Sequence, residues 1–260
     1  MKRFFRDLKR YFRYILFSAK SQLKAEVSNS YLNWLWWILE PLCFTVLYVF
    51  IFQVLFKSKE QHFPVFVMVG LTVWNYFNKT VKNSVGLIKK NRSVVTRIYV
   101  PKFVFVLVDM FVNTFKMLIS FGIIFIMMIV FKVPFGLTIL YIIPILFVLN
   151  VLIFGFNTIL MHFGVFVGDL SNIMNILLRF LFYLSGIFYS VRKRVPGIYG
   201  KLLLKFNPMA FIINESRNVL LYRKTPDFRF LTAWLVVGLL LSGVGVWIIY
   251  KNENSYAKVI

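Results

Sequence analysis

Three polar side chains, Asp109, Asn113 and Lys116, follow one another in an apolar run at spacings of four and three residues. Residues so spaced share one face of a helix, and such a stripe could relay protons, line a polar path or hydrogen-bond to a neighbouring helix. We expect interhelical hydrogen bonds from it. Arg179 is the candidate for a polar path, unless Asp109 or Glu40 neutralises it, because a charge within an apolar run is costly unless it has a function.

The chain lacks the residue patterns of the common catalytic sites. No G-x-x-x-x-G-K-[ST] motif occurs, since Val195 stands where the first glycine before Gly200-Lys201 belongs. Neither G-x-S-x-G nor H-E-x-x-H occurs. His62 and His162 are far apart in the chain, so we expect no metal site. These absences predict a protein that is not an enzyme and that binds no cofactor itself.

The composition is typical of a membrane protein. Hydrophobic residues make up 60% of the 260 residues and charged residues only 15%, and the mean hydropathy is +0.76. A soluble domain is about 45–50% apolar and about a quarter charged, so the composition excludes a soluble enzyme and a disordered chain. The formal net charge of +22 comes from basic residues between apolar runs. That pattern fits loops beside an anionic leaflet rather than nucleic-acid binding.

The apolar runs predict an all-α, polytopic membrane protein with six transmembrane helices. About 20 apolar residues are needed to cross a bilayer. The second run is apolar only as far as residue 77, and we expect it to continue as a helix to residue 88 while Lys79 and Lys82 snorkel. The predicted spans are residues 34–56, 63–88, 103–131, 137–167, 173–189 and 230–250.

Three segments flank or interrupt this single transmembrane domain of residues 34–250. Residues 1–33 place apolar and basic side chains at helical spacing, which predicts an amphipathic helix in the cytoplasmic headgroup layer or, alternatively, an ordinary packed helix. Residues 190–229 hold apolar pieces too short to cross, broken by Gly and Pro, which predicts re-entrant half-helices on the outer side. Residues 251–260 form a short tail.

The basic residues predict that both termini are cytoplasmic. In that orientation 17 Lys and Arg lie inside and 12 lie outside, and the early loops orient a chain most strongly. Nine of the outer group fall in residues 190–229, in conflict with the positive-inside rule. A polyanionic cargo attracted to these charges, or lipid headgroups bound by them, would account for the conflict.

Five short motifs occur in order along nearly the whole chain. They are Ser30-Tyr31-Leu32-Asn33-Trp34-Leu35-Trp36 with Glu40-Pro41-Leu42, then Ile98-Tyr99-Val100-Pro101-Lys102, Asp169, Phe182-Tyr183-Leu184-Ser185-Gly186-Ile187-Phe188-Tyr189, and Asn207-Pro208-Met209 followed by Arg217 and Leu220. Each is weak alone, but their order resembles the membrane subunits of bacterial type-2 ABC exporters. These permeases export polysaccharides and polyol phosphates such as O-antigen, teichoic acid and capsule.

The resemblance implies a permease subunit in a bacterial inner or plasma membrane. It implies a homodimer that binds two cytoplasmic ABC ATPase subunits, which use ATP and Mg²⁺, and a lipid-linked glycan as the substrate. Residues 86–100 would dock on the ATPase, although a basic anchoring loop without a partner is the alternative. The candidate coupling residues are Leu87, Ile88, Arg92, Val94, Val95 and Arg97.

The resemblance also implies a substrate path between the first and fifth predicted spans. Aromatic rings stack on sugar C–H faces, and Tyr hydroxyls hydrogen-bond to sugars. Glu40, six residues after Trp34, either lines this path or reaches the headgroup layer. The candidate path residues are Trp37, Glu40, Tyr48, Arg179, Phe182, Tyr183 and Tyr189, and the candidates for a basic exit are Arg192, Lys193, Arg194 and Arg217.

Two other function classes stay open. A secondary transporter would use the intramembrane charges as a proton relay and would need no ATPase. A membrane glycosyl- or phosphosugar-transferase would need an acidic catalytic cluster, which nine scattered Asp and Glu residues do not form. Copurification with an ATPase would separate an ABC permease from both.

Overall fold

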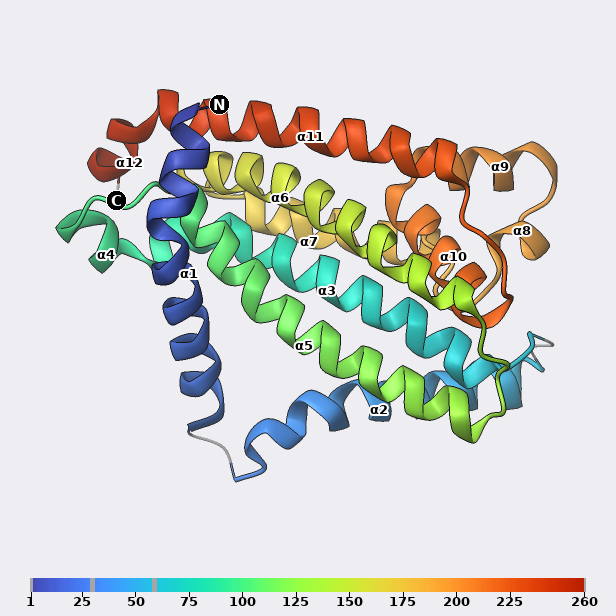
Figure 1. Ribbon diagram of the computed structural model, residues 1–260. Helices are drawn as coiled ribbons and strands as arrows, with labels where there is room; N and C mark the ends of the chain where they lie inside the picture. Colours follow the sequence, from blue (N-terminus) through green and yellow to red (C-terminus); the bar gives the residue numbers. More distant parts are fainter. Residues whose placement is uncertain (1, 29–30, 58–59, 260) are drawn as a thin grey trace.

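The computed structural model describes residues 2–28, 31–57 and 60–259 (Figure 1). Within those ranges the chain forms helices and short connections and contains no β-strand, so the all-α fold class is confirmed. Residues 1, 29–30 and 260, which belong to the predicted amino-terminal segment and tail, lie outside the described residues.

The long helices run side by side, and successive ones point in opposite directions (Figure 1). One end of the bundle, here the terminal end, carries both termini, α4 and α12; the other, the hairpin end, carries α8 and α9. The bundle helices are α2 (Trp36–Val49, continued by the π-helix Phe50–Leu55), α3 (Phe63–Lys90), α5 (Phe103–Val130), α6 (Ile142–Phe166, preceded by the 3-10 helix Leu137–Tyr141), α7 (Leu170–Leu184) and α11 (Phe228–Lys251). The remaining helices are α1 (Lys2–Ser28), α4 (Arg92–Arg97), α8 (Val191–Arg194), α9 (Gly197–Phe206), α10 (Pro208–Leu221) and α12 (Glu253–Val259).

Four helical segments of the described chain are long and apolar enough to cross a membrane: Trp36–Leu55, Phe103–Val130, Leu137–Phe166 and Phe228–Lys251. They correspond to four of the six predicted spans. The other two predicted spans, residues 63–88 and 173–189, correspond to α3 and α7, which are not among these four segments. The second half of α3 carries asparagines and lysines between its apolar residues, and α7 has only 15 residues.

α3 lies at the centre of the bundle, in contact with α2, α5, α6, α7 and α10. Its first half is almost wholly buried, as the exposed fractions of 0% at Val65, Val67 and Val69 illustrate. Neighbouring helices cover this half, so it needs no lipid-facing apolar surface, whereas the second half exposes polar residues such as Lys79 and Lys82.

α7 ends earlier than the sequence predicts, at Leu184 rather than residue 189. Gly186 has a φ of +66°, a left-handed conformation that terminates a helix and that only glycine adopts without strain. A side chain there would also meet Val191, since an added Cβ would lie 2.5 Å from its Cγ2 atom. The turn sends Ile187 and Phe188 back into the core, where both are buried.

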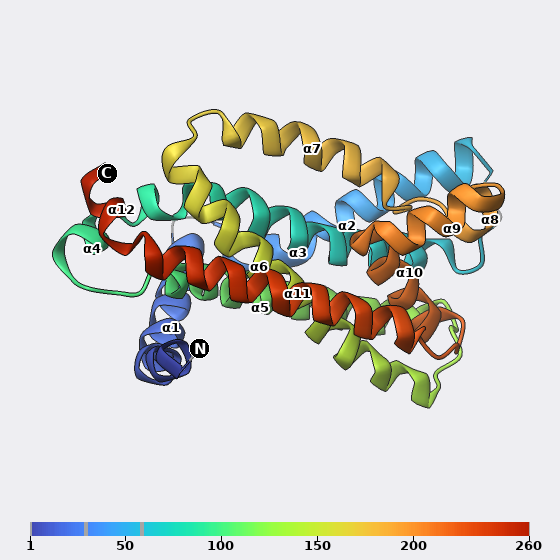
Figure 2. The same cartoon turned by 90° about the horizontal axis from the view of Figure 1, so that it is seen from above.

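The amphipathic pattern of the first residues is confirmed as α1, which packs on α5 through its apolar face. Ile15 and Ala19 are buried, whereas Lys9, Arg10 and Arg13 are exposed. Figure 2 shows α1 nearly end-on while α11 is seen along its length, so α1 crosses the bundle rather than running with it. That orientation suits a helix whose basic face lies in a headgroup layer.

Close contact between α6 and α11 depends on glycines. An added Cβ at Gly155 of α6 would lie 2.6 Å from the backbone nitrogen of Ser242 and 2.7 Å from the Cβ of Leu241 on α11. Small residues allow this approach of two helix backbones, so Gly155→Leu would force the helices apart. We expect it to lower the free energy of unfolding by about 2 kcal/mol.

The thermal unfolding midpoint of the purified protein in detergent measures this effect. Gly243→Leu on α11 is the matched control, because no atom lies within 4 Å of a Cβ added at Gly243. Equal midpoints for the two variants would contradict the close-packing argument.

Candidate transport site

A polar cleft of about 420 Å³ lies between α3 and α7. Three residues of α3 line it, Trp74, Asn78 and Lys82, and their spacing of four residues places them on one helix face. The facing residues of α7 are Asn175, Leu178, Arg179, Phe182 and Tyr183. The cleft therefore combines two cations, two carboxamides and three aromatic rings.

The two helices run in opposite directions, which fixes the order of groups along the cleft. The ring centres of Trp74 and Phe182 are 5.5 Å apart at one end. Lys82 lies two helical turns further along α3, about 12 Å away at the rise of an α-helix. Lys82 therefore lies at the end of the cleft that Asn175 of α7 lines. The aromatic rings gather toward the hairpin end, and the cations and amides extend toward the terminal end.

Four of the predicted path residues join this cleft to α2 through one aromatic cluster. The ring centre of Phe188 lies 4.4 Å from that of Tyr48 and 5.3 Å from that of Phe182. The hydroxyl of Tyr189 donates a hydrogen bond to the backbone carbonyl of Tyr183, at 2.8 Å. Tyr48, Phe182, Tyr183 and Tyr189 are thus neighbours in space, and Arg179 extends the group by one turn of α7.

Neither cation of the cleft has an acidic partner among the described residues. Lys82 and Arg179 are both exposed, and none of the ion pairs in the described chain includes them. Glu40 instead pairs with Lys79, at 3.1 Å. Asp109 accepts hydrogen bonds from two asparagine amides, at 2.8 and 3.1 Å. Neither carboxylate therefore neutralises Arg179, and both positive charges are available to a ligand.

Two predicted path residues, Trp37 and Glu40, lie elsewhere. They line a small recess between α2, α3 and α5 together with Lys116. The ammonium of Lys116 lies 5.8 Å from the ring centre of Trp37 and forms an ion pair with Glu26 of α1. These contacts, with the hydrogen bond from Asn83 of α3 to Asp109 of α5, confirm that the polar stripe of α5 binds neighbouring helices.

The predicted coupling residues separate into a buried and an exposed group. Leu87, Ile88 and Val95 are 6%, 0% and 7% exposed, so they belong to the core and not to a docking surface. The sequence prediction fails for Leu87 and Ile88 because α3 continues to Lys90 and its last turns pack inward. It fails for Val95 because this residue is on the buried side of α4. Val94 is half-buried. Arg92 and Arg97 of α4 are exposed, as are Ile98 and Tyr99 after it.

A hydrogen-bonded cluster at the terminal end holds this exposed segment in place. Tyr99 donates a hydrogen bond to Glu253 of α12, at 2.5 Å. Arg3 of α1 donates to the Tyr99 hydroxyl and to Glu253, at 2.7 and 2.8 Å. Partial burial raises the pKa of Tyr99 to about 12, and the bond to Glu253 adds to the rise. The hydroxyl therefore stays a donor at neutral pH, and α1 and α12 both brace the segment after α4.

The residues predicted to form a basic exit also separate into an exposed group and a buried residue. Arg192, Lys193 and Arg194 are exposed on α8 at the hairpin end. Arg217, predicted with them, is only 4% exposed and is a structural residue. Its guanidinium donates hydrogen bonds to the backbone carbonyls of Phe66, Gly186 and Ile187, at 3.0, 2.7 and 2.6 Å. Five donors in a planar fork suit this arrangement, which joins α10 to α3 and to the turn after α7.

Sequence reasoning missed the α3 side of the cleft. Trp74, Asn78 and Lys82 recur every four residues, which is a helical stripe as regular as the one on α5. The sequence predicts only that Lys82 snorkels, and it does not indicate that this stripe faces Asn175 and Arg179. Only the packing of α3 against α7 shows that the two stripes face each other.

Four apolar helical segments of membrane-spanning length in the described chain indicate an integral membrane protein, and the cleft between α3 and α7 is its candidate transport site. The chain belongs to the ABC-2 type transporter family, whose profile matches residues 15–221. It is similar to the O-antigen export system permease protein RfbA of Klebsiella pneumoniae, with 23% identity over 243 residues that cover 93% of each chain. It is also similar to the protein of the same name from Myxococcus xanthus, with 24% identity over 261 residues that cover 100% of each.

Proposed function

We propose that this chain is the permease subunit of an ATP-driven ABC exporter that moves a lipid-linked cell-surface polysaccharide across the inner or plasma membrane of a bacterium. The family membership supports the transporter type, and the names of the full-length relatives support O-antigen or a similar glycan as the cargo. The observation that carries the proposal is the cleft between α3 and α7. Its composition matches the chemistry of a glycan joined to phosphate.

In this proposal each group of the cleft binds a different part of the substrate. Arg179 and Lys82 attract the phosphate that links glycan to lipid, since charge-assisted hydrogen bonds to phosphate are stronger than neutral ones. The amides of Asn78 and Asn175 can donate to and accept from sugar hydroxyls. The rings at the other end, with Tyr48 of α2, offer faces on which sugar C–H groups stack.

The proposed topology has six membrane crossings, made by α2, α3, α5, α6, α7 and α11. The 28 residues of α3 extend about 42 Å, which exceeds the roughly 30 Å hydrocarbon core. The shorter α7 would cross with the help of the turn that follows it. The terminal end is cytoplasmic in this proposal, and α8, α9 and α10 form the outer re-entrant segment. α10 has 14 residues and is too short to cross.

ATP hydrolysis requires partners in this proposal, because the sequence holds no P-loop. A homodimer of the permease would bind two cytoplasmic ABC ATPase subunits, which use ATP with Mg²⁺. The docking surface is the exposed part of residues 86–100, chiefly Arg92 and Arg97 with Ile98. Its bracing by α1 and α12 suits a segment that transmits force.

The test is transport of a lipid-linked glycan in vesicles that contain the purified chain, with and without an ABC ATPase encoded beside it. We expect transport only with the ATPase and ATP, and none when the P-loop lysine of the ATPase is replaced. Arg92→Glu combined with Arg97→Glu should lower the copurifying ATPase at least fivefold, since the reversed charges oppose docking. Lys132→Glu at the hairpin end is the matched control.

Glycan transport by the chain alone, driven by a proton gradient, would identify a secondary transporter and refute the proposal. Unchanged copurification of Arg92→Glu with Arg97→Glu would place the ATPase contact on a different surface of the terminal end.

A further inference from the structure

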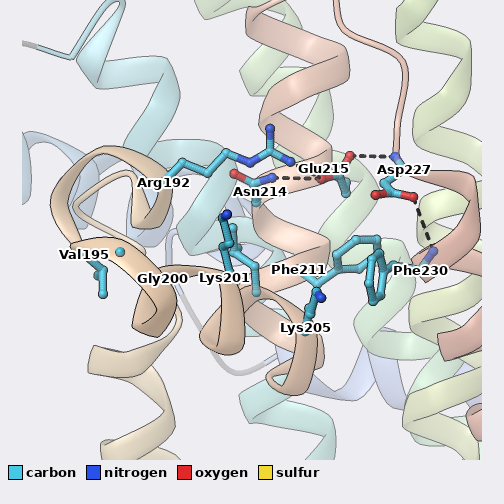
Figure 3. Close-up of a pocket in the computed structure, with 12 residues that line it drawn as sticks. Arg192, Val195, Gly200, Lys201, Lys205, Phe211, Asn214, Glu215, Asp227 and Phe230 are labelled. Atoms are coloured by element: carbon cyan, nitrogen blue, oxygen red, sulfur yellow. Dashed lines mark hydrogen bonds and ion pairs between the residues drawn. The ribbon is translucent and has the colours of Figure 1, made fainter.

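Another pocket, of about 470 Å³, lies at the hairpin end (Figure 3). It shares no lining residue with the cleft. α8, α9, α10 and the start of α11 enclose it. Its volume falls within the range of about 300–1,000 Å³ usual for small-ligand sites. Three cations line it, Arg192, Lys201 and Lys205, beside an apolar floor that includes Phe211 and Phe230.

The carboxylates in this pocket are already engaged. Glu215 is 1% exposed and accepts hydrogen bonds from the amides of Asn214 and Asn218, at 2.8 and 3.1 Å, and from the backbone nitrogen of Asp227, at 3.1 Å. Arg192 lies 3.9 Å from the same carboxylate. Asp227 accepts from the first backbone nitrogens of α11 and caps that helix. Both negative charges are therefore satisfied by protein groups.

The two lysines are not engaged in this way. Lys201 and Lys205 lie one turn apart on α9, both are exposed, and no ion pair of the described residues includes either. The ammonium of Lys205 lies 5.5 Å from the ring centre of Phe230. Residues 190–229 carry nine Lys and Arg against two acidic residues. Arg192 pairs with Glu215 and Lys193 pairs with Glu60, so Lys201 and Lys205 are the cations of the pocket that have no acidic partner among the described residues.

An apolar face of α9 next to the two lysines places the pocket beside lipid. Ile198, Tyr199, Leu202 and Phe206 form a stripe at helical spacing, and all four are exposed. In a membrane protein such a stripe contacts acyl chains, while the lysines on the neighbouring face of the same helix reach the headgroup layer. α9 thus has the two faces needed to hold an amphiphile by its head.

We propose that this pocket binds the phosphate group of an anionic lipid. The phosphate is held by Lys201, Lys205 and Arg192, the glycerol or sugar attached to it rests on Phe211 and Phe230, and the acyl chains extend along the apolar stripe of α9. The bound phosphate supplies the negative charge that Lys201 and Lys205 lack among the described residues. Bulk phospholipid and the lipid carrier of a glycan present the same chemistry. The proposal does not depend on the proposed export function, since it requires only that the chain lies in a bilayer.

The test uses the full chain in lipid nanodiscs without ATPase or cargo. Photoreactive phosphatidylglycerol or photoreactive phosphatidylcholine is added at equal amounts, and crosslinks are mapped to peptides of residues 190–229 by mass spectrometry. We expect at least fivefold more labelling by the anionic lipid. Lys201→Gln with Lys205→Gln should reduce it to the phosphatidylcholine value, while Lys201→Arg with Lys205→Arg keeps it.

Lys132→Gln with Lys224→Gln is the matched control, because it removes two exposed lysines from the same end but outside the pocket. Equal labelling by the two lipids, or no change in the Gln pair, would overturn the proposal. Complete competition by soluble glycerol phosphate would overturn the lipid assignment in favour of a free phosphate ester. All substituted side chains are exposed, so we expect every variant to fold. Size-exclusion profiles check this.

Discussion

Arg217→Met is expected to lower the free energy of unfolding by about 3 kcal/mol or more, enough to remove most of the folded protein. The guanidinium is buried and satisfies the carbonyls of Phe66, Gly186 and Ile187. Methionine has no donor, and each buried acceptor left unpaired costs about 1–3 kcal/mol. The substitution also removes a cation whose central carbon lies 3.4 Å from the ring centre of Phe66.

The yield of monodisperse protein and its thermal midpoint in detergent measure this loss. Arg217→Lys should be nearly as harmful, because one ammonium cannot reach three carbonyls that a planar fork reaches together. Arg229→Met, which changes an exposed arginine, is the matched control and should melt like the unaltered protein. A normal melting temperature for Arg217→Met would show that the carbonyls find other donors and that Arg217 is not structural.

Helix positions in this chain follow from its sequence because long apolar runs with few breaks leave little choice. The predicted span 103–131 is α5 to within one residue, and 137–167 is the continuous helical stretch Leu137–Phe166. The span 173–189 was less accurate at its end. Hydrophobicity continues past Leu184, and only the conformation of Gly186 turns the chain there.

The burial of individual charged residues could not be predicted in the same way. Arg217 belongs to a segment with nine basic residues, the same segment that holds the exposed Arg192. Its burial depends on carbonyls that α3 and the turn after α7 leave free, so it is a property of the tertiary structure. Leu87 and Ile88 are apolar residues that are predicted at a docking surface and are buried instead. An amphipathic pattern does not indicate whether its apolar face packs on its own helix bundle or on a partner protein.

The candidate site was predicted on one side only. Phe182 and Tyr183 of α7 follow from a motif and Arg179 from its charge within an apolar run, and no motif marks the facing residues of α3. Two stripes on different helices form a cleft only if the helices pack with those faces together, which depends on contacts spread over the whole bundle. The pairing of Trp74 with Phe182 sets the register that a sequence alone does not contain.

Removing both cations of the cleft is expected to stop most transport while leaving the fold intact. Lys82→Gln with Arg179→Gln should lower the export rate of a phosphate-linked glycan at least a hundredfold, and each single change about tenfold. A charge-assisted hydrogen bond contributes about 1.5–3 kcal/mol, and 1.4 kcal/mol corresponds to a factor of ten. Both side chains are exposed to the cleft and have no partner among the described residues, so the folded yield should not change.

Export in the reconstituted vesicles measures the rate, and Lys132→Gln outside the cleft is the control. Accessibility gives an independent measure: Arg179→Cys in a Cys43→Ser background should react with a water-soluble thiol reagent, because Arg179 lines an open cleft. The same double change should affect a glycan linked to its lipid without phosphate far less, since only the phosphate needs the two positive charges. If both cargoes slow equally, the cations shape the cleft rather than bind the anion, and the phosphate contact must lie further along the path, toward Tyr48 and Tyr189.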